Sequence, residues 1–194
     1  MPRPSLREHV IAAAVEQFHR RGYHASGVKD ITDAANLPKG SFYNYFSSKE
    51  EMALEALRRY GLGRQLERLR DPGTPPVDRL RAHFVFFGDD LNHDGTNLGC
   101  MFGNFAAESI STGPALRDAV GNAWSHWIAA LTVALTEMKE LGELPADRDV
   151  DLLARGLARA WQGTVLHAKV LQDMSPIDDF FAGVFEPLLG LPAR

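Results

Sequence analysis

Apolar residues recur three and four positions apart along almost the whole chain. In the first stretch, Val10, Ala14, Val15 and Phe18 fall on one face of a helix from about Ser5 to Arg21. No run rich in Val, Ile and Thr alternates with polar residues between turn signals, so no strand is predicted. The pattern therefore predicts an all-α fold of about nine helices.

Local signals set the first helix boundaries. Ser5 and Glu8 form a capping box, and Gly22 ends the first helix. Ser26 is expected to cap a second helix that continues through Ala35. After the turn Asn36-Leu37-Pro38, a short third helix is expected at 39–46, and Ser48 is expected to cap a fourth that continues to about Leu69.

The linker Asp71-Pro72-Gly73-Thr74-Pro75-Pro76 is the clearest break in the chain, because Pro and Gly both interrupt helices. Five further helices are expected after it, at about 77–91, 100–110, 115–141, 150–172 and 176–189. The last of these carries Pro176 in its first turn, where proline is tolerated.

Composition narrows the class of protein. The net charge of −4 argues at first against nucleic acid, but residues 1–50 carry seven basic against five acidic residues, whereas the remainder carries 14 against 20. This asymmetry points to one face for phosphate. The single cysteine, Cys100, excludes an internal disulfide and a cysteine-rich zinc site. Without a signal peptide or a membrane-spanning apolar run, the expected compartment is the cytoplasm.

The second and third expected helices, joined by a tight turn, have the anatomy of a helix-turn-helix, in which the second helix of the pair enters the major groove. Helix starts at 39–41 and 48–49 offer free amides to phosphate, and Gly40 lets the backbone approach closely. Phe42 and Phe46 are expected to pack inward. The candidate DNA-binding residues are Ser26, Lys29, Lys39, Gly40, Ser41, Tyr43, Asn44, Tyr45 and Lys49.

The stretches GYHASGVKDI (22–31) and KGSFYNYFSSKE (39–50), with Ala34 and Ala35 between them, resemble the signature of TetR family transcriptional repressors. The match covers residues 5–55 and departs from the family pattern at Gly27, where Ser or Thr is usual. The resemblance implies a DNA-binding domain at 1–48 and a ligand-binding and dimerisation domain at 49–194. It also implies a homodimer on a palindromic operator in double-stranded DNA.

In this family the last two helices form the dimer interface. Here they carry Leu152, Leu153, Leu157, Trp161, Val165, Ile177, Phe180, Phe181, Val184, Phe185 and Leu188. An isologous interface and a buried monomer core explain these apolar residues equally well, so the dimer rests on the resemblance.

The stretch GCMFGNFAAE (99–108) resembles a motif of one TetR subgroup, which includes regulators that respond to reactive electrophiles and acrylate-like compounds. In that subgroup a cysteine and a lysine act together, and Cys100 and Lys169 match those residue types. A helix start stabilises a thiolate, the form that reacts with electrophiles. A lone cysteine is also commonly a small buried apolar residue, and both interpretations stay open.

Aromatic side chains in the second half are candidates for the walls of a ligand pocket. The candidate ligand or sensor residues are Cys100, Asn104, Phe84, Phe87, Trp124, Trp127, Trp161, Gln162 and Lys169, and His167 is a further polar candidate. These aromatic residues equally fit a plain helical core.

The sequence therefore predicts a repressor that leaves its operator when it binds a small-molecule inducer or when an electrophile modifies Cys100. The alternative is a thiol-independent repressor with a reversible aromatic or hydrophobic ligand. An enzyme is the third hypothesis, but neither a zinc-ligand spacing nor a nucleophile or phosphate-loop motif supports it. Asp89, Asp90, His93 and Asp94 could hold a metal, although a solvated loop explains them better; we expect neither a metal nor a cofactor.

Overall fold

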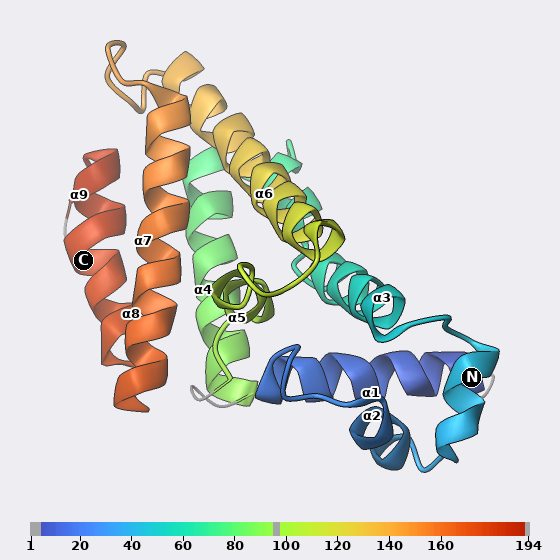
Figure 1. The fold of residues 1–194 in the computed structure, drawn as a ribbon. Coiled ribbons are helices and arrows are strands. Elements are labelled where there is room, and N and C mark those ends of the chain that lie inside the picture. Colours follow the sequence, from blue (N-terminus) through green and yellow to red (C-terminus); the bar gives the residue numbers. More distant parts are fainter. Residues whose placement is uncertain (1–4, 95–97, 193–194) are drawn as a thin grey trace. The chain divides into compact units, whose positions relative to one another are not determined.

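The computed structural model describes residues 5–94 and 98–192, and every regular element within them is helical (Figure 1). The first half contains α1 (Leu6–Arg21), α2 (Val28–Ala34), η1 (Lys39–Asn44), α3 (Lys49–Leu62), η2 (Leu66–Arg70) and α4 (Pro76–Asp94). The second half contains α5 (Met101–Ala107), α6 (Pro114–Glu140), α7 (Val150–Leu171), α8 (Ser175–Phe180), η3 (Phe181–Phe185) and α9 (Glu186–Leu189). The predicted all-α fold is confirmed.

Several predicted boundaries are confirmed as well. Ser5 caps α1 by accepting a hydrogen bond from the Glu8 amide. Gly22 ends that helix at φ +79°, a left-handed conformation that glycine adopts without steric cost. Ser48 caps α3 by accepting from the Glu51 amide.

Other boundaries are corrected. The helix expected to continue to about Leu69 ends at Leu62, and the chain resumes as the 3₁₀ segment η2 after Gln65, whose φ is +52°. Two glycines, Gly61 and Gly63, weaken the end of α3, because glycine has a poor helix propensity. The expected last helix consists of α8, a π-helical segment at 181–185, and α9.

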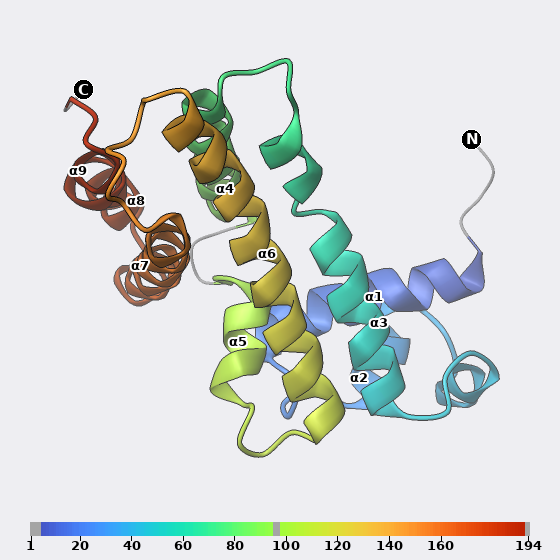
Figure 2. The same cartoon turned by 90° about the horizontal axis from the view of Figure 1, so that it is seen from above.

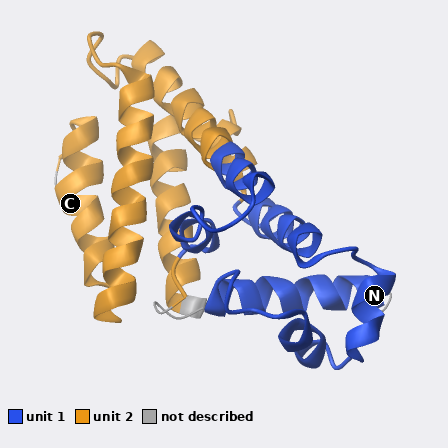
Figure 3. Cartoon of the chain, in the orientation of Figure 1, with its two compact units in different colours: residues 1–64, 100–123 blue, residues 65–99, 124–194 orange. Residues whose placement is uncertain are grey.

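The contacts within the chain divide it into two compact units (Figure 3). Unit 1 comprises residues 1–64 and 100–123, and unit 2 comprises residues 65–99 and 124–194. Helix α6 passes from one unit into the other. The boundaries of these units differ from the predicted boundary between a DNA-binding domain at 1–48 and a ligand-binding domain at 49–194. That functional division stays a prediction.

In unit 1, α1 packs against both α2 and α3 (Figures 1 and 2). The apolar face predicted for the first helix supplies Val10, Ala14 and Phe18, each fully buried. Ile31 of α2 and Met52 of α3 are also fully buried. This shared core fixes the helices on which the predicted DNA-binding residues stand.

In unit 2, α7 lies beside the run from α8 to α9 (Figure 1). Its apolar stripe is buried against neighbouring helices, with Leu157 and Trp161 almost fully covered. Arg81 of α4 pairs with the buried Glu186 at 3.1 Å and stacks over the Phe185 ring. The buried charge is thus paired, as a low-dielectric interior requires.

Candidate functional site

The 3₁₀ segment η1 has one buried and one exposed face. Phe42 is fully buried and Phe46 is 2% exposed, which confirms that both rings pack inward. On the outer face Tyr43 is 60% exposed, and Asn44 and Lys39 are exposed as well. Buried aromatic rings therefore anchor a short element whose polar side chains face solvent.

The third helix is shorter and tighter than predicted. It ends at Asn44 instead of Phe46, and it is a 3₁₀ helix instead of an α-helix. Tyr45, at its C-cap, is half-buried, and Ser41 is half-buried as well. A Cβ at Gly40 would meet no atom within 4 Å, so the outer side of this residue is open.

Ser26 does not have the predicted role. Its side chain is fully buried, and its hydroxyl lies 2.8 Å from the Gly22 carbonyl oxygen and 3.1 Å from that of Gln17. Gly27 is the N-cap of α2, and its amide donates to the Asp30 carboxylate at 2.7 Å. Ser26 is therefore a buried brace between the first two helices, neither a helix cap nor a phosphate ligand.

Lys49 is already bound within the protein. Its ammonium donates to the Tyr23 carbonyl oxygen at 2.9 Å and lies 4.1 Å from the centre of the Tyr23 ring. Partial burial lowers the pKa of Lys49, and the nearby Glu108 carboxylate partly opposes that shift. A phosphate at the start of α3 would meet a cation that the loop after α1 holds in place.

Two acidic side chains, those of Asp33 and Glu51, bond donors in the helix-turn-helix region. Lys29, on the exposed side of α2, pairs with Asp33, which raises the pKa of the lysine. Glu51 accepts hydrogen bonds from the Ser47 hydroxyl and amide, and these bonds lower the pKa of its carboxyl. The Asp33 carboxylate therefore competes with phosphate for Lys29, which is one of the predicted DNA contacts.

Residues 100–108 of the predicted sensor motif lie in unit 1. Cys100 is the half-buried N-cap of α5. Asn104 was expected among the polar groups of a ligand pocket, but its side-chain amide donates to the His19 carbonyl oxygen at 3.1 Å. Lys169, in unit 2, donates to the Leu98 carbonyl oxygen at 3.4 Å. The pairing of Cys100 with Lys169 stays a prediction.

The predicted aromatic residues of unit 2 largely come together. Phe84 and Phe87 of α4 lie within 6.3 Å, centre to centre, of the rings of Trp127 and Trp161. Within the described residues, the indole Nε1 of Trp124 is a buried donor without a hydrogen-bond partner. Gln162 of α7 is half-buried.

Sequence reasoning missed His83. Its side chain is 4% exposed, and its Nε2 accepts a hydrogen bond from Trp127 Nε1 at 2.8 Å. This bond requires the neutral tautomer with its proton on Nδ1. The available signal was the position of His83 beside Phe84 in an otherwise apolar stretch of helix.

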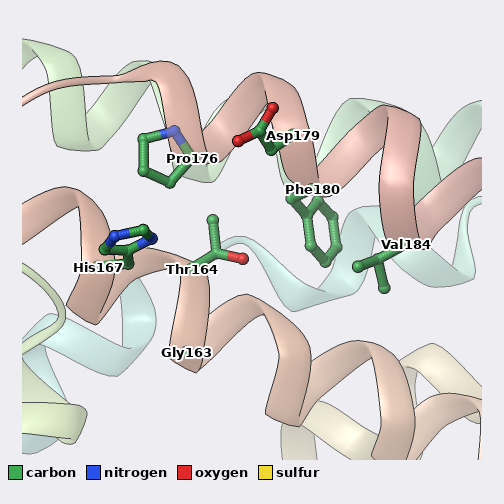
Figure 4. Close-up of a pocket in the computed structure, with 7 residues that line it drawn as sticks. All are labelled: Gly163, Thr164, His167, Pro176, Asp179, Phe180 and Val184. Carbon is green, nitrogen blue, oxygen red and sulfur yellow. The ribbon is translucent and has the colours of Figure 1, made fainter.

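The apolar residues predicted for the dimer interface divide into buried and exposed ones, and Leu152 is among the exposed. Leu153, Leu157, Trp161, Val165, Ile177, Phe180 and Phe185 are buried within the chain itself, so the core interpretation is correct for them. The exposed apolar residues of this helix are Leu152, Leu166, Val170 and Leu171. A groove of about 210 Å³ lies at the surface between α7 and the segment 176–184, and His167 lines it beside Gly163 and Thr164 (Figure 4).

Within the described residues, no three His, Cys, Asp or Glu side chains are grouped so that they could hold a metal ion. The side chains of His93 and Asp94 lie outside what the structure describes. In the same described ranges, no helix is long and apolar enough to cross a membrane.

The order α2, turn, η1, with aromatic rings buried beneath the second element and polar side chains exposed on it, is the arrangement of a helix-turn-helix, a class of DNA-binding element. A family model described as "Bacterial regulatory proteins, tetR family" matches residues 10–56. A second, described as "Tetracyclin repressor-like, C-terminal domain", matches residues 76–184. The chain belongs to the TetR family.

Known relatives span nearly the whole chain. It is 36% identical to the HTH-type transcriptional repressor DhaR of Mycobacterium sp. strain GP1, over 97% of this chain and 95% of DhaR. The crystal structure of a regulatory protein TetR from Rhodobacter sphaeroides matches with a TM-score of 0.86 and 30% identity, covering 96% of this chain and 98% of that one. The reduced form of Escherichia coli NemR matches with a TM-score of 0.84 and 28% identity, covering 97% and 99%.

These relatives are transcriptional regulators, and so is this chain, which is not an enzyme.

Proposed function

We propose that this regulator is a homodimeric repressor that binds a palindromic operator with the exposed face of η1. The observation that carries the proposal is the contrast between Phe42, fully buried, and Tyr43, 60% exposed, on one short segment. A rigid base presents the phenol of Tyr43 and the amide of Asn44 to base edges or phosphate oxygens. Lys39, Gly40 and Ser41 lie at the start of the segment and are assigned to the phosphate backbone, with Lys29, Tyr45 and Lys49 around it.

The proposed dimer uses α7 and the run from α8 to α9. The exposed side chains of Leu152, Leu166 and Val170 on α7 support it, because apolar surface is costly to leave in water. Two-fold symmetry then presents two copies of η1 to two half-sites of the operator.

The proposed signal is chemical modification of Cys100. A thiolate sulfur forms a C–S bond with the β-carbon of an α,β-unsaturated carbonyl compound, and the α-carbon takes a proton from water. Cys100 is half-buried and directly precedes α5, whose Asn104 bonds the end of α1. An added group at Cys100 would therefore disturb a segment joined to the DNA-binding helices.

The second candidate signal is a reversible aromatic or hydrophobic ligand in unit 2. The buried, unpartnered Nε1 of Trp124 favours it, since a ligand acceptor would satisfy this donor. The rings of Phe84, Phe87, Trp127 and Trp161 in the same unit would supply apolar contacts.

One titration distinguishes these signals. Fluorescence anisotropy of duplexes from the region upstream of the gene is measured with protein treated or untreated with N-ethylmaleimide, a thiol-reactive electrophile. We expect tight, salt-sensitive binding that treatment abolishes in the wild type but not in Cys100→Ser. Binding that treatment leaves unchanged would reduce Cys100 to a packing residue and favour the reversible ligand. The absence of binding to any duplex would contradict the proposed operator.

A further inference from the structure

Helix α5 is far from α1 in the sequence, yet the two share one core. The Phe105 ring lies 5.8 Å from the Phe18 ring and 6.0 Å from the Tyr23 ring, centre to centre. Phe102 meets the ring of Tyr60, on α3, at 5.4 Å. Residues 100–123 are thus structurally part of the unit that carries η1.

Directly after α5, Glu108 binds the loop that follows α1. Its Oε1 accepts a hydrogen bond from the Tyr23 amide at 3.0 Å, and its Oε2 accepts one from the His24 amide at 2.8 Å. Gly22 makes room for this carboxylate, because a Cβ at that position would lie 2.0 Å from Oε1. A few residues earlier, in α5, Asn104 donates to the carbonyl oxygen of His19, which lies in the last turn of α1.

The loop that Glu108 holds also fixes both sides of the helix-turn-helix. The Tyr23 carbonyl accepts from Lys49, the first residue of α3. The buried Ser26 hydroxyl bonds the Gly22 carbonyl just before α2 begins. Residues 22–26 therefore connect the start of α2 with the start of α3, and η1 lies between these two helices.

We propose that Glu108 is a positioning residue for DNA binding. Its carboxylate accepts hydrogen bonds from the Tyr23 and His24 amides and so sets the positions of Lys49 and of α2, on either side of η1. This inference rests on the proposed function, because it takes η1 and Lys49 as DNA contacts. It adds that a residue outside the helix-turn-helix, on a segment about 60 positions further along the chain, determines operator affinity.

The variant that tests the inference is Glu108→Ala. Its matched control is Glu16→Ala, which removes the same charge from an exposed position on α1, where Glu16 pairs only loosely with Arg20 at 3.5 Å. Any general electrostatic gain toward DNA is then equal in the two variants. Glu108→Gln is the conservative variant, because its side chain keeps one carbonyl acceptor for the two amides.

Operator affinity is measured by anisotropy on the duplex that the wild type binds. We expect Glu108→Ala to bind about tenfold more weakly or worse, because charge-assisted hydrogen bonds that order the loop are lost. Glu108→Gln should recover part of this loss, and Glu16→Ala should match the wild type. Far-ultraviolet circular dichroism would establish that each variant is folded.

Two further measurements separate positioning from a merely structural role. Amide hydrogen exchange, followed by NMR, should become faster at Tyr23 and His24 in Glu108→Ala and stay unchanged in Glu16→Ala. Gly22→Ala should weaken operator binding strongly in the wild type and much less in Glu108→Ala. The backbone strain at φ +79° is common to both backgrounds, so the difference reports the clash with the carboxylate.

The failures are distinguishable. Wild-type affinity in a folded Glu108→Ala would overturn the inference and leave the proposed function intact. Unchanged amide hydrogen exchange at Tyr23 and His24 would also overturn the inference, since the two hydrogen bonds to Glu108 would then not order the loop. If the wild type binds no duplex, the proposed function is wrong, and this inference, which depends on it, is wrong as well.

Discussion

At the scale of single residues, side-chain groups replace the backbone partners that helix ends lack. The loop after α1 has amides and carbonyls that no helix can satisfy, and Ser26, Lys49 and Glu108 bond them. Such bonds contribute modestly when made but are expensive to lose once buried. The energetic effect of each side chain therefore depends on its burial more than on its type.

Ser26→Ala is predicted to destabilise the protein. The Ser26 hydroxyl shares its single proton between the carbonyl oxygens of Gln17 and Gly22, and the substitution removes this buried hydrogen bond. The expected loss is about 1–3 kcal/mol in the free energy of unfolding, measured by urea denaturation. Ser47→Ala serves as control, because its hydroxyl bonds Glu51 at an exposed position, and its effect should stay within about 0.5 kcal/mol. Equal losses in both variants would contradict the assigned role of Ser26.

At the scale of the element, the two faces of η1 have different roles: the buried face contributes to stability, and the exposed face is proposed to contact DNA. A 3₁₀ helix has about three residues per turn, so neighbouring side chains point in clearly different directions. Phe42 lies in the core of unit 1, while its neighbour Tyr43 lies at the surface, with the two rings edge to face at 5.2 Å. Substitutions at adjacent positions should therefore have opposite consequences.

Phe42→Ala should cost about 3–5 kcal/mol of stability, because it leaves a cavity in a closely packed core. Tyr43→Ala should leave the unfolding midpoint almost unchanged and weaken operator binding about tenfold or more. Chemical denaturation and anisotropy on the same two proteins provide the comparison. A Tyr43 variant with wild-type affinity would remove that side chain from the proposed DNA surface.

At the scale of the whole molecule, apolar surface remains on the outer side of α7. Leu166 is 63% exposed and Val170, one turn further, is 72% exposed. Isolated exposed apolar residues are ordinary, but two residues one turn apart on the same helix fit the interface proposed for the dimer.

Leu166→Glu and Val170→Glu are predicted to weaken the dimer about tenfold or more, because a carboxylate would lose its hydration in the interface. Sedimentation velocity over a range of protein concentrations measures the effect. Val133→Glu, at a 41% exposed position on α6, makes the same chemical change outside the proposed interface and should leave the dimer intact. If all three variants associate like the wild type, the interface lies elsewhere.

The sequence by itself determined the helical class, most helix limits, and the inward packing of Phe42 and Phe46. These follow from local rules, since caps, glycine ends and apolar spacing act within a few residues. The motif at 22–50 was enough to indicate the family, because a helix-turn-helix is contiguous in sequence.

Only the tertiary structure decided the roles of residues whose partners are distant in the chain. Serine is a residue type favoured at helix caps, but the position of Ser26 between α1 and α2 makes it a buried brace. Asn104 and Glu108 read as part of a sensor motif, yet they bond the end of α1 and the loop after it. His83 accepts a buried hydrogen bond from Trp127, which lies 44 positions away in the sequence. Hydrogen bonds depend on positions in space, and sequence spacing does not specify those positions between separate elements.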